Sequence, residues 1–468
     1  MTGEELQEKL LYKKKNGYYD LTEQDKKEIF EFSEGYKAFL DAGKTERECV
    51  RVAVKEAEKC GFTPLNTKKT LKTGDKVYIV NRDKSILLAV IGKKPISEGT
   101  RMAAAHIDSP RLDLKPNPLY ENTEIAYFKT HYYGGIKKYQ WPTIPLAIHG
   151  TVIKNNGEAV NLCIGEKDSD PVFCITDLLP HLAASQMKGE ATKLIDAEKL
   201  NVILGTIPFE DEKISDGVKL NILKLLNDEY GITERDFISA EIEIVPAYKA
   251  KDVGLDRSLV GGYGHDDRVC AYTALKAILD SDVKEYTTLC YLVDKEETGS
   301  SDATGMRSRF FEDTLAEMCA KSEDNYTDLS VRKALSSSLC LSSDVTAALD
   351  PTFDSVMERN NSSYLNKGVC FMKYTGARGK SGTSDCSCEY VQKITSVMDE
   401  AGVVWQTGEL GKVDEGGGGT VAQYLAMLNM QVIDCGVPLL SMHAPFELAS
   451  KFDIYQAYKG YKSFFACI

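Results

Sequence analysis

Short apolar segments that alternate with helix-like segments constrain the fold of this chain more than any other feature. Two helix-like segments near the N-terminus, DKKEIFEFSEGYKAFLDAG and TERECVRVAVKEAEKCGF, precede the strand-like segments KVYIVN, SILLAVIG and TRMAAAHID. After about residue 253 the alternation returns, in segments such as RVCAYTALKAIL, TTLCYLV and SLCLSSD. Apolar strands separated by amphipathic helices predict a largely parallel sheet covered by helices on both faces. We therefore expect a three-layer α/β/α domain.

A segment of different composition separates the two parts of this pattern. Between residues 111 and 252 the sequence is rich in Pro, Gly, Tyr and alternating β-forming residues, which predicts antiparallel strands. The chain has 468 residues, more than a single hydrophobic core usually serves, so at least two domains are expected. We predict an α/β domain formed by residues 1–110 and 253–468, interrupted by a mostly β insert at residues 111–252.

The composition favours a cytoplasmic globular protein. A net charge of −13 argues against a nucleic-acid or anionic-membrane partner. The N-terminal segment MTGEELQEKLLYKKKNGYYD lacks the apolar core of a signal peptide, and no run approaches the roughly 18 apolar residues of a membrane helix. The 13 cysteines are dispersed, mostly singly within apolar stretches, which favours reduced thiols over a disulfide framework.

Residue types that bind metal ions follow the predicted strands or precede a helix. These residues are His106, Asp108, Asp266, Glu296, Glu297, Asp344 and His443. In open α/β sheets, ligands bind at the carboxyl ends of the strands. One such residue alone is more often a structural group, but burying this many charged groups is costly unless they are paired or bind a metal. Imidazole and carboxylate groups, without a convincing cysteine ligand, predict a hydrolytic zinc- or manganese-like site.

Charge counting favours two metal ions over one. Two divalent cations carry four positive charges, and the carboxylates of Asp266, Glu297 and Asp344 supply three negative charges. One bound hydroxide would make the site neutral. A single ion with the same carboxylates would be over-neutralised and a poor Lewis acid. The adjacent Glu296 and Glu297 then have distinct tasks, because one binds a metal ion while its neighbour takes a proton from the bridging water.

The histidines divide into ligands and non-ligands. Residues two apart on a strand point to the same side, so Asp108 is placed to accept the ring N–H of His106 and fix its tautomer. The spacing around His131, His149 and His265 predicts no metal ligand.

With these residues identified, the sequence resembles the aspartyl aminopeptidase (aminopeptidase I) family of dinuclear zinc exopeptidases. The motifs AHIDSPRL, GHDDRV, EETGS, SSDVTAALDP, NKGVC, GGGGT and SMHAPFE occur in the family's order and cover essentially the whole chain. The resemblance implies that His106 and Asp344 hold one zinc ion. It also implies that Glu297 and His443 hold the other ion, and that Asp266 bridges the two.

The resemblance further implies a catalytic mechanism and an assembly. Glu296 would be the general base, and Asp108 would orient His106. The substrates would be peptides with a free N-terminus, and Co²⁺ or Mn²⁺ would substitute for the two zinc ions. The insert would be a dimerisation domain, and dimers would assemble into a tetrahedral dodecamer.

The expected substrate contacts are Lys367, Gly418 and His181. Lys367 in NKG matches the family's basic residue near the substrate side chain, with a surface lysine as the alternative. Gly418 belongs to a glycine-rich loop expected to line the substrate cleft. The segment PHLAAS keeps His181 but has Ser185 in place of the family's second histidine, and YYGGIKKYQW looks more like the bacterial branch. We therefore expect a weak preference for acidic or polar N-terminal residues.

Two other functions remain open at this point. The same dinuclear site would suit an acylase or deacetylase that acts on N-acyl amino acids. The chain could also be an assembly shell without catalysis, although the complete metal set and Glu296 argue against that alternative.

Overall fold

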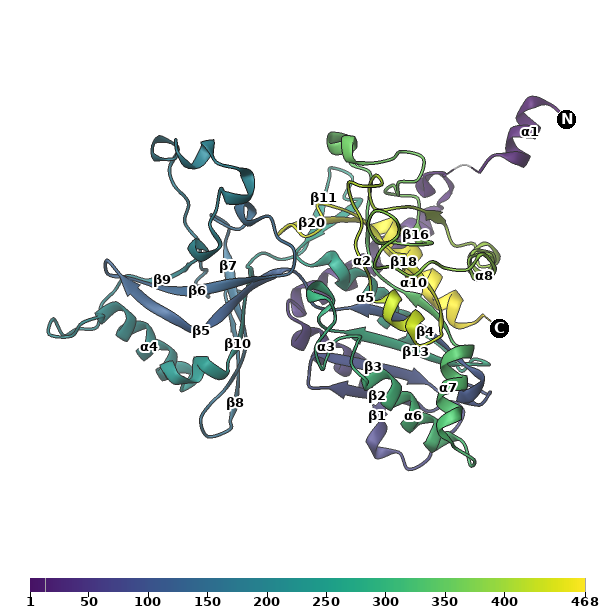
Figure 1. The fold of residues 1–468 in the computed structure, drawn as a ribbon, viewed down its shortest axis with the longest axis horizontal. Helices are drawn as coiled ribbons and strands as arrows, with labels where there is room; N and C mark the ends of the chain where they lie inside the picture. Colours follow the sequence, from purple (N-terminus) through teal and green to yellow (C-terminus); the bar gives the residue numbers. More distant parts are fainter. Residues whose placement is uncertain (13, 468) are drawn as a thin grey trace.

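The computed structural model describes residues 1–12 and 14–467. A nine-stranded sheet forms the centre of the larger part of the molecule (Figure 1). In spatial order its strands are β1 (Thr63–Pro64), β2 (Lys76–Asn81), β3 (Ser85–Val90), β13 (Thr287–Val293), β4 (Thr100–His106), β14 (Leu339–Ser342), β18 (Gln431–Gly436), β16 (Val369–Met372) and β17 (Trp405–Thr407). The four central strands β13, β4, β14 and β18 are parallel, whereas β3 and β16 pair with them in the antiparallel direction.

Helices cover both faces of this sheet. The first layer contains α2 (Glu23–Ala42), α3 (Glu46–Lys59), α5 (His265–Leu279), α8 (Cys388–Glu400) and α10 (Lys451–Phe465). The second layer contains α6 (Phe310–Ser322), α7 (Asp328–Ser337) and α9 (Ala422–Met427). Side chains alternate along a strand, so Ala103 and Ala105 of β4 join the core under the first layer, while Met102 and Ala104 join the other. The predicted three-layer arrangement is therefore present.

The starts of α2 and α3 follow from local sequence. The side chains of Thr22 and Thr45 each accept a backbone N–H of the first helical turn. The carboxylates of Asp25 and Glu48 in turn accept the backbone N–H of the capping threonine. The separate N-terminal helix α1 (Gly3–Leu10) projects from the body and buries no residue (Figure 1). No helix within residues 1–12 and 14–467 is both long and apolar enough to cross a membrane.

Residues of the insert form a second, six-stranded antiparallel sheet that projects from the α/β part (Figure 1). Its strands, in spatial order, are β8 (Ala159–Ile164), β7 (Leu146–Ile153), β10 (Glu241–Pro246), β5 (Arg111–Asn122), β6 (Ile125–Tyr133) and β9 (Val202–Gly205). Helix α4 (Gly217–Tyr230) packs against this sheet through Ile222, Leu223 and Leu226. The apolar side chains around Phe128 and Trp141 give this sheet a core of its own.

A third, smaller sheet was not predicted. Its strands are β11 (Lys251–Val253), β12 (Leu259–Gly262), β20 (Glu447–Ser450), β19 (Pro438–Leu440) and β15 (Thr346–Ala347). Strands of two to four residues are too short to show an alternating pattern in the sequence. The sheet matters for the site, because the loop between β19 and β20 carries His443.

Candidate metal centre

The carboxyl ends of three neighbouring strands bring several of the sequence-predicted residues together. His106 is the last residue of β4 and pairs in register with Val293, the last residue of β13. The short helix η10 (Glu296–Thr298) follows β13 and carries the acid pair, and Asp344 follows β14, which pairs with β4 on its other side. Because parallel strands end at the same sheet edge, three separate chain segments deliver their polar side chains to one place.

Asp266 faces both histidines. It lies at the start of α5, and its Oδ1 is 3.0 Å from His106 Nε2. Its Oδ2 is 3.1 Å from His443 Nε2. One carboxylate thus presents a separate oxygen to each imidazole, which is the arrangement expected of a group that bridges two cations.

The remaining carboxylates divide between the two histidines. Asp344 Oδ1 lies 3.9 Å and Glu296 Oε2 lies 4.0 Å from His106 Nε2. Glu297 Oε1 lies 3.5 Å from His443 Nε2, is buried, and has no hydrogen-bond partner within the described residues. Two sets of ligand atoms share His106, one with Asp266 and Glu297 and the other with Glu296 and Asp344, and within each set every atom lies within 4.8 Å of the others. His443 adds a further imidazole through its contacts with Asp266 and Glu297. This nitrogen and oxygen donor set fits zinc.

Burial makes these carboxylates costly to charge without cations. It raises the pKa of Glu297 and Asp344 well above the usual carboxyl range. Burial alone would also raise the pKa of Asp266, but contacts with His106 and His443 outweigh it and hold that pKa below its ordinary value. Divalent cations held among these groups would stabilise the charged carboxylates.

Glu296 has the properties of a proton acceptor. Burial raises its pKa to about 7, with His106 opposing the shift and Asp108 adding to it. A general base works best when its pKa is close to the operating pH.

Asp108 contacts both the acid pair and His106. Its Oδ1 accepts the backbone N–H of Glu296 at 3.1 Å, and its Oδ2 accepts that of Glu297 at 3.2 Å. His106 Nδ1 lies 3.0 Å from the backbone carbonyl oxygen of Asp108 and 3.4 Å from its carboxylate. The backbone carbonyl is thus the nearer acceptor for the ring N–H, and the carboxylate beside it also holds the turn that carries the two glutamates.

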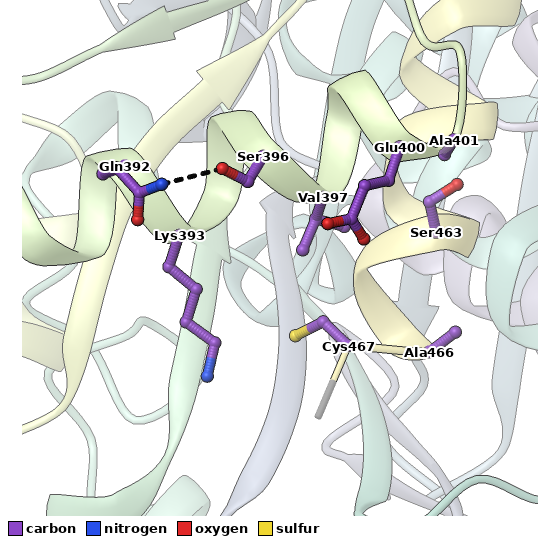
Figure 2. Close-up of a pocket in the computed structure, with 9 residues that line it drawn as sticks. All are labelled: Gln392, Lys393, Ser396, Val397, Glu400, Ala401, Ser463, Ala466 and Cys467. Atoms are coloured by element: carbon purple, nitrogen blue, oxygen red, sulfur yellow. Dashed lines mark hydrogen bonds between the residues drawn. The ribbon is translucent and has the colours of Figure 1, made fainter.

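A cavity of about 370 Å³ opens beside these groups. Besides the ligand-type residues, its walls contain apolar side chains, threonine hydroxyls and a glycine loop. These residues are Val345, Met372, Leu410, Met442, Thr346, Thr375, Thr420 and residues 417–419. A larger cavity of about 850 Å³ lies between α8 and α10, where Lys393, Glu400 and Cys467 line it (Figure 2). That cavity shares no residue with the first and has no imidazole and carboxylate cluster.

The geometry agrees with the similarity to known proteins. Residues 39–465 match the family described as Aminopeptidase I zinc metalloprotease (M18). The chain belongs to this family. It is a zinc aminopeptidase, and the resemblance seen in its motifs is confirmed.

Relatives and solved structures cover almost the entire aminopeptidase. The probable M18 family aminopeptidase 1 of Clostridium acetobutylicum is 52% identical over 97% of this chain and 98% of that protein. The crystal structure of an M18 aminopeptidase from Thermotoga maritima has a TM-score of 0.94 at 43% identity, covering 98% of this chain and all of that one (100%). The crystal structure of aminopeptidase I from C. acetobutylicum has a TM-score of 0.91 at 50% identity, over 97% and 100% of the two chains. These likenesses confirm the predicted fold class.

Three expected substrate contacts of the aminopeptidase have different positions. Gly418 lines the cavity, and its carbonyl oxygen accepts the N–H of Gly376 at 2.7 Å. Lys367 does not line the cavity, and its ammonium group donates to the carbonyl oxygen of Lys14 at 2.8 Å. His181 is exposed in the short helix η5 (Pro180–Leu182) of the insert and does not reach the cavity of its own chain.

The other histidines have partners away from the ligand cluster. His265 Nδ1 lies 2.7 Å from the hydroxyl of Tyr36. His149 lies between carboxylates of Glu48 and Glu166, and His131 Nδ1 lies 2.8 Å from the carbonyl oxygen of Tyr132.

Sequence reasoning missed Glu447, which supports two of the ligand-bearing residues. Its Oε1 accepts the backbone N–H of His443 at 2.7 Å, and its Oε2 accepts that of Asp266 at 3.2 Å. Glu447 is buried. Its position four residues after His443 in SMHAPFE was the available signal.

Proposed function

We propose that this aminopeptidase holds two zinc ions per chain and uses them to remove one N-terminal residue from a peptide. The observation that carries this proposal is the orientation of Asp266, whose two carboxylate oxygens face one histidine each. His106 with Asp344 would hold one ion, and His443 with Glu297 would hold the other. When bound, the ions supply Lewis-acid polarisation of the scissile carbonyl and lower the pKa of the attacking water.

The chain's own groups divide the remaining work. Glu296, which is not a proposed ligand, takes the proton of the attacking water and passes it to the leaving amine. Asp108 holds the turn that carries Glu296 through its backbone N–H. The free amine of the substrate would meet carboxylates at the ligand-bearing end of the cavity. A blocked amine would lose this contact, which favours a peptidase over an acylase.

We propose a neutral, apolar first residue in place of the weak acidic preference expected from sequence. Among the described residues that line the cavity there is no lysine or arginine, and Lys367 points to another partner. Met372, Leu410 and Met442 instead supply apolar surface. A carboxylate moved from water into such a wall without a cation is disfavoured, whereas an apolar side chain gains from burial.

Substitutions at Glu296 and Asp266 test the dinuclear mechanism. Glu296→Gln removes the proton acceptor but no proposed ligand, so zinc content should stay at two ions while kcat falls about 10²–10⁴-fold. Asp266→Asn places a neutral amide between the cations, so zinc content should fall. Metal analysis of the purified variants and turnover of an unblocked peptide measure both effects. Full zinc occupancy in Asp266→Asn would count against the bridge.

We also propose a cytoplasmic homo-oligomer, in which the insert forms dimers and the dimers form a tetrahedral dodecamer. One structure with a TM-score of 0.74 and 19% identity is described as the S. cerevisiae mApe1 dodecamer. The insert exposes apolar side chains such as Leu182 (69%) and Met187 (71%), which subunit contacts would cover. His181 lies in the same segment and could then face another chain. None of the 13 cysteines, all within the described residues, forms a disulfide, which supports a reducing compartment.

Sedimentation of the zinc-loaded protein tests the assembly. The expected result is one species with the mass of twelve chains. A monomer at micromolar concentration would contradict the proposal.

A further inference from the structure

The insert enters the ligand cluster through three consecutive residues at the end of β6. We call residues 133–135 (Tyr-Gly-Gly) the insert strap. Tyr133 is the last residue of β6 and pairs in register with Arg111 of β5, so the strap is anchored in the six-stranded sheet. The Arg111 guanidinium also lies 4.0 Å from the centre of the Tyr133 ring. Each residue of the strap contacts a different proposed site residue.

Gly135 fixes the ring of His443. Its carbonyl oxygen lies 2.8 Å from His443 Nδ1. A carbonyl oxygen can only accept, so Nδ1 carries the hydrogen, which leaves the lone pair of Nε2 available to the proposed zinc ion. Within the described residues, this carbonyl is the one hydrogen-bond partner of the His443 ring besides the site carboxylates. The loop that carries His443 needs such support, because Ser441 and His443 both have left-handed backbone, with φ of 58° and 64°.

Tyr133 holds the acid pair through Asp108. Its hydroxyl donates to Asp108 Oδ2 at 2.7 Å, the oxygen that also accepts the backbone N–H of Glu297. The Tyr133 ring is buried, so this hydrogen bond is shielded from water. Loss of the hydroxyl would remove one hydrogen bond to the Asp108 carboxylate and so weaken its hold on the Glu296–Glu297 turn.

Gly134 allows the strap to lie directly against the cluster. Its φ is +70°, and a Cβ at this position would lie 3.0 Å from Glu297 Oε2 and 3.4 Å from the Cα of Pro110. A side chain at this position would crowd Glu297 and would need a left-handed backbone, which residues other than glycine rarely adopt.

We propose that Tyr133 and Gly135 are positioning residues of the metal centre, through which the insert sets the orientation of His443 and of the Glu296–Glu297 turn. This inference rests on the proposed dinuclear function. It assigns the insert a part in metal binding that is separate from any part in assembly.

The test compares Gly135→Ala and Tyr133→Phe with Gly205→Ala. An alanine Cβ at position 135 would lie 3.2 Å from His443 Nδ1 and displace the ring. At Gly205, in β9 of the same sheet, the Cβ would meet only Ile222, a flexible side chain, at 3.1 Å and 4.0 Å. Zinc affinity by chelator competition, the visible spectrum of the Co²⁺-loaded protein, and kcat and KM are measured for all three.

We expect Gly135→Ala to lose zinc affinity about 10–100-fold and to change the Co²⁺ spectrum. Tyr133→Phe should lower kcat about tenfold or more with KM unchanged, because the turn that carries the proton acceptor loses support. Its zinc affinity should fall less than that of Gly135→Ala, because the ligand Glu297 is affected only through its backbone. Gly205→Ala should match the native protein. Native zinc affinity and spectrum in Gly135→Ala, together with native kcat in Tyr133→Phe, would overturn the proposal. If Gly135→Ala fails to fold, native kcat in Tyr133→Phe is enough to contradict the proposed role of Tyr133 in positioning the Glu296–Glu297 turn.

The zinc readouts keep this proposal separate from the proposed function. If the native protein binds a single zinc ion or leaves unblocked peptides intact, the dinuclear peptidase function fails. The affinity and spectrum of Gly135→Ala would still report whether the strap orients His443.

Discussion

A substitution of Met372 gives the most direct test of the proposed substrate preference. It lines the cavity beside the ligand cluster, whereas Lys367 is directed to the carbonyl oxygen of Lys14. Met372→Lys should place a cation in the cavity and raise kcat/KM for Asp- and Glu-peptides relative to Leu-peptides. A charge-assisted hydrogen bond contributes roughly 1.5–3 kcal/mol, which is about tenfold to a hundredfold in that ratio.

Lys367→Met is the matched control for this prediction, since it removes a cation that the cavity does not use. Its Asp/Leu ratio should equal that of the native aminopeptidase, which should itself prefer Leu. A preference of the native protein for Asp-peptides, or a loss of that preference in Lys367→Met, would contradict the proposed preference for a neutral first residue.

The sequence identified residues whose chemistry follows from their place at strand ends, and missed those defined by contacts between distant segments. His106 and Asp344 follow recognisable apolar runs, so their convergence could be predicted from the parallel sheet. Glu447 and Gly135 act through hydrogen bonds to residues on other loops. The position of Lys367 in a motif gave its neighbourhood in the chain but not the direction of its side chain, which depends on the N-terminal segment.

At the scale of elements, a buried histidine joins α3 to the insert sheet. His149 of β7 lies 2.8 Å from Glu48 of α3 and 3.1 Å from Glu166, and Lys44 contacts Glu166 as well. Burial alone would lower the pKa of His149, but contacts with Cys163, Glu166 and Glu48 outweigh it and raise that pKa to about 11. The charged imidazole therefore ties the two parts together at neutral pH.

His149→Gln should lower the free energy of unfolding by about 3 kcal/mol at pH 6, the cost of removing one partner of a buried ion pair. The folded-state pKa of about 11 lies above the unfolded value of about 6.5, so the stabilisation is complete below pH 6.5 and is lost as pH rises toward 11. Urea unfolding between pH 6 and 9 should show the difference from native shrinking with pH. The exposed His131→Gln is the control, and a difference that grows with pH would contradict the ion pair.

The elements that the sequence predicted well are those with long, consistent patterns. Helices α2 and α3 and strands β4 and β13 coincide with the segments that alternate most clearly. Helix α4 was missed within the expected β insert, because its apolar residues lie against a sheet assembled from distant strands. The third sheet was missed because its strands have two to four residues each.

For the whole molecule, the α/β part and the insert are joined at the site as well as along the chain. Ligand-type residues come from β4, η10, α5, the segment after β14 and the β19–β20 loop, and the insert strap lies against one side of the cluster. Composition and alternation could predict two parts with different architecture. They could not predict that the insert contacts the ligand cluster, because that contact depends on where β6 ends in space.

Removal of zinc should therefore destabilise the whole fold and not only abolish activity. A ligand that binds only the folded state stabilises it by about 2.7 kcal/mol per site when its free concentration is a hundredfold above Kd. Dialysis against a chelator should lower the Tm, and added zinc should restore it, because buried Glu297 and Asp344 otherwise resist ionisation. Glu296→Gln, which keeps every proposed ligand, should show the full zinc response, whereas Asp266→Asn should show a much smaller one. Equal Tm values with and without zinc in the native protein would mean that this cluster does not bind the metal tightly, since linkage requires a ligand that favours the folded state to raise its melting temperature.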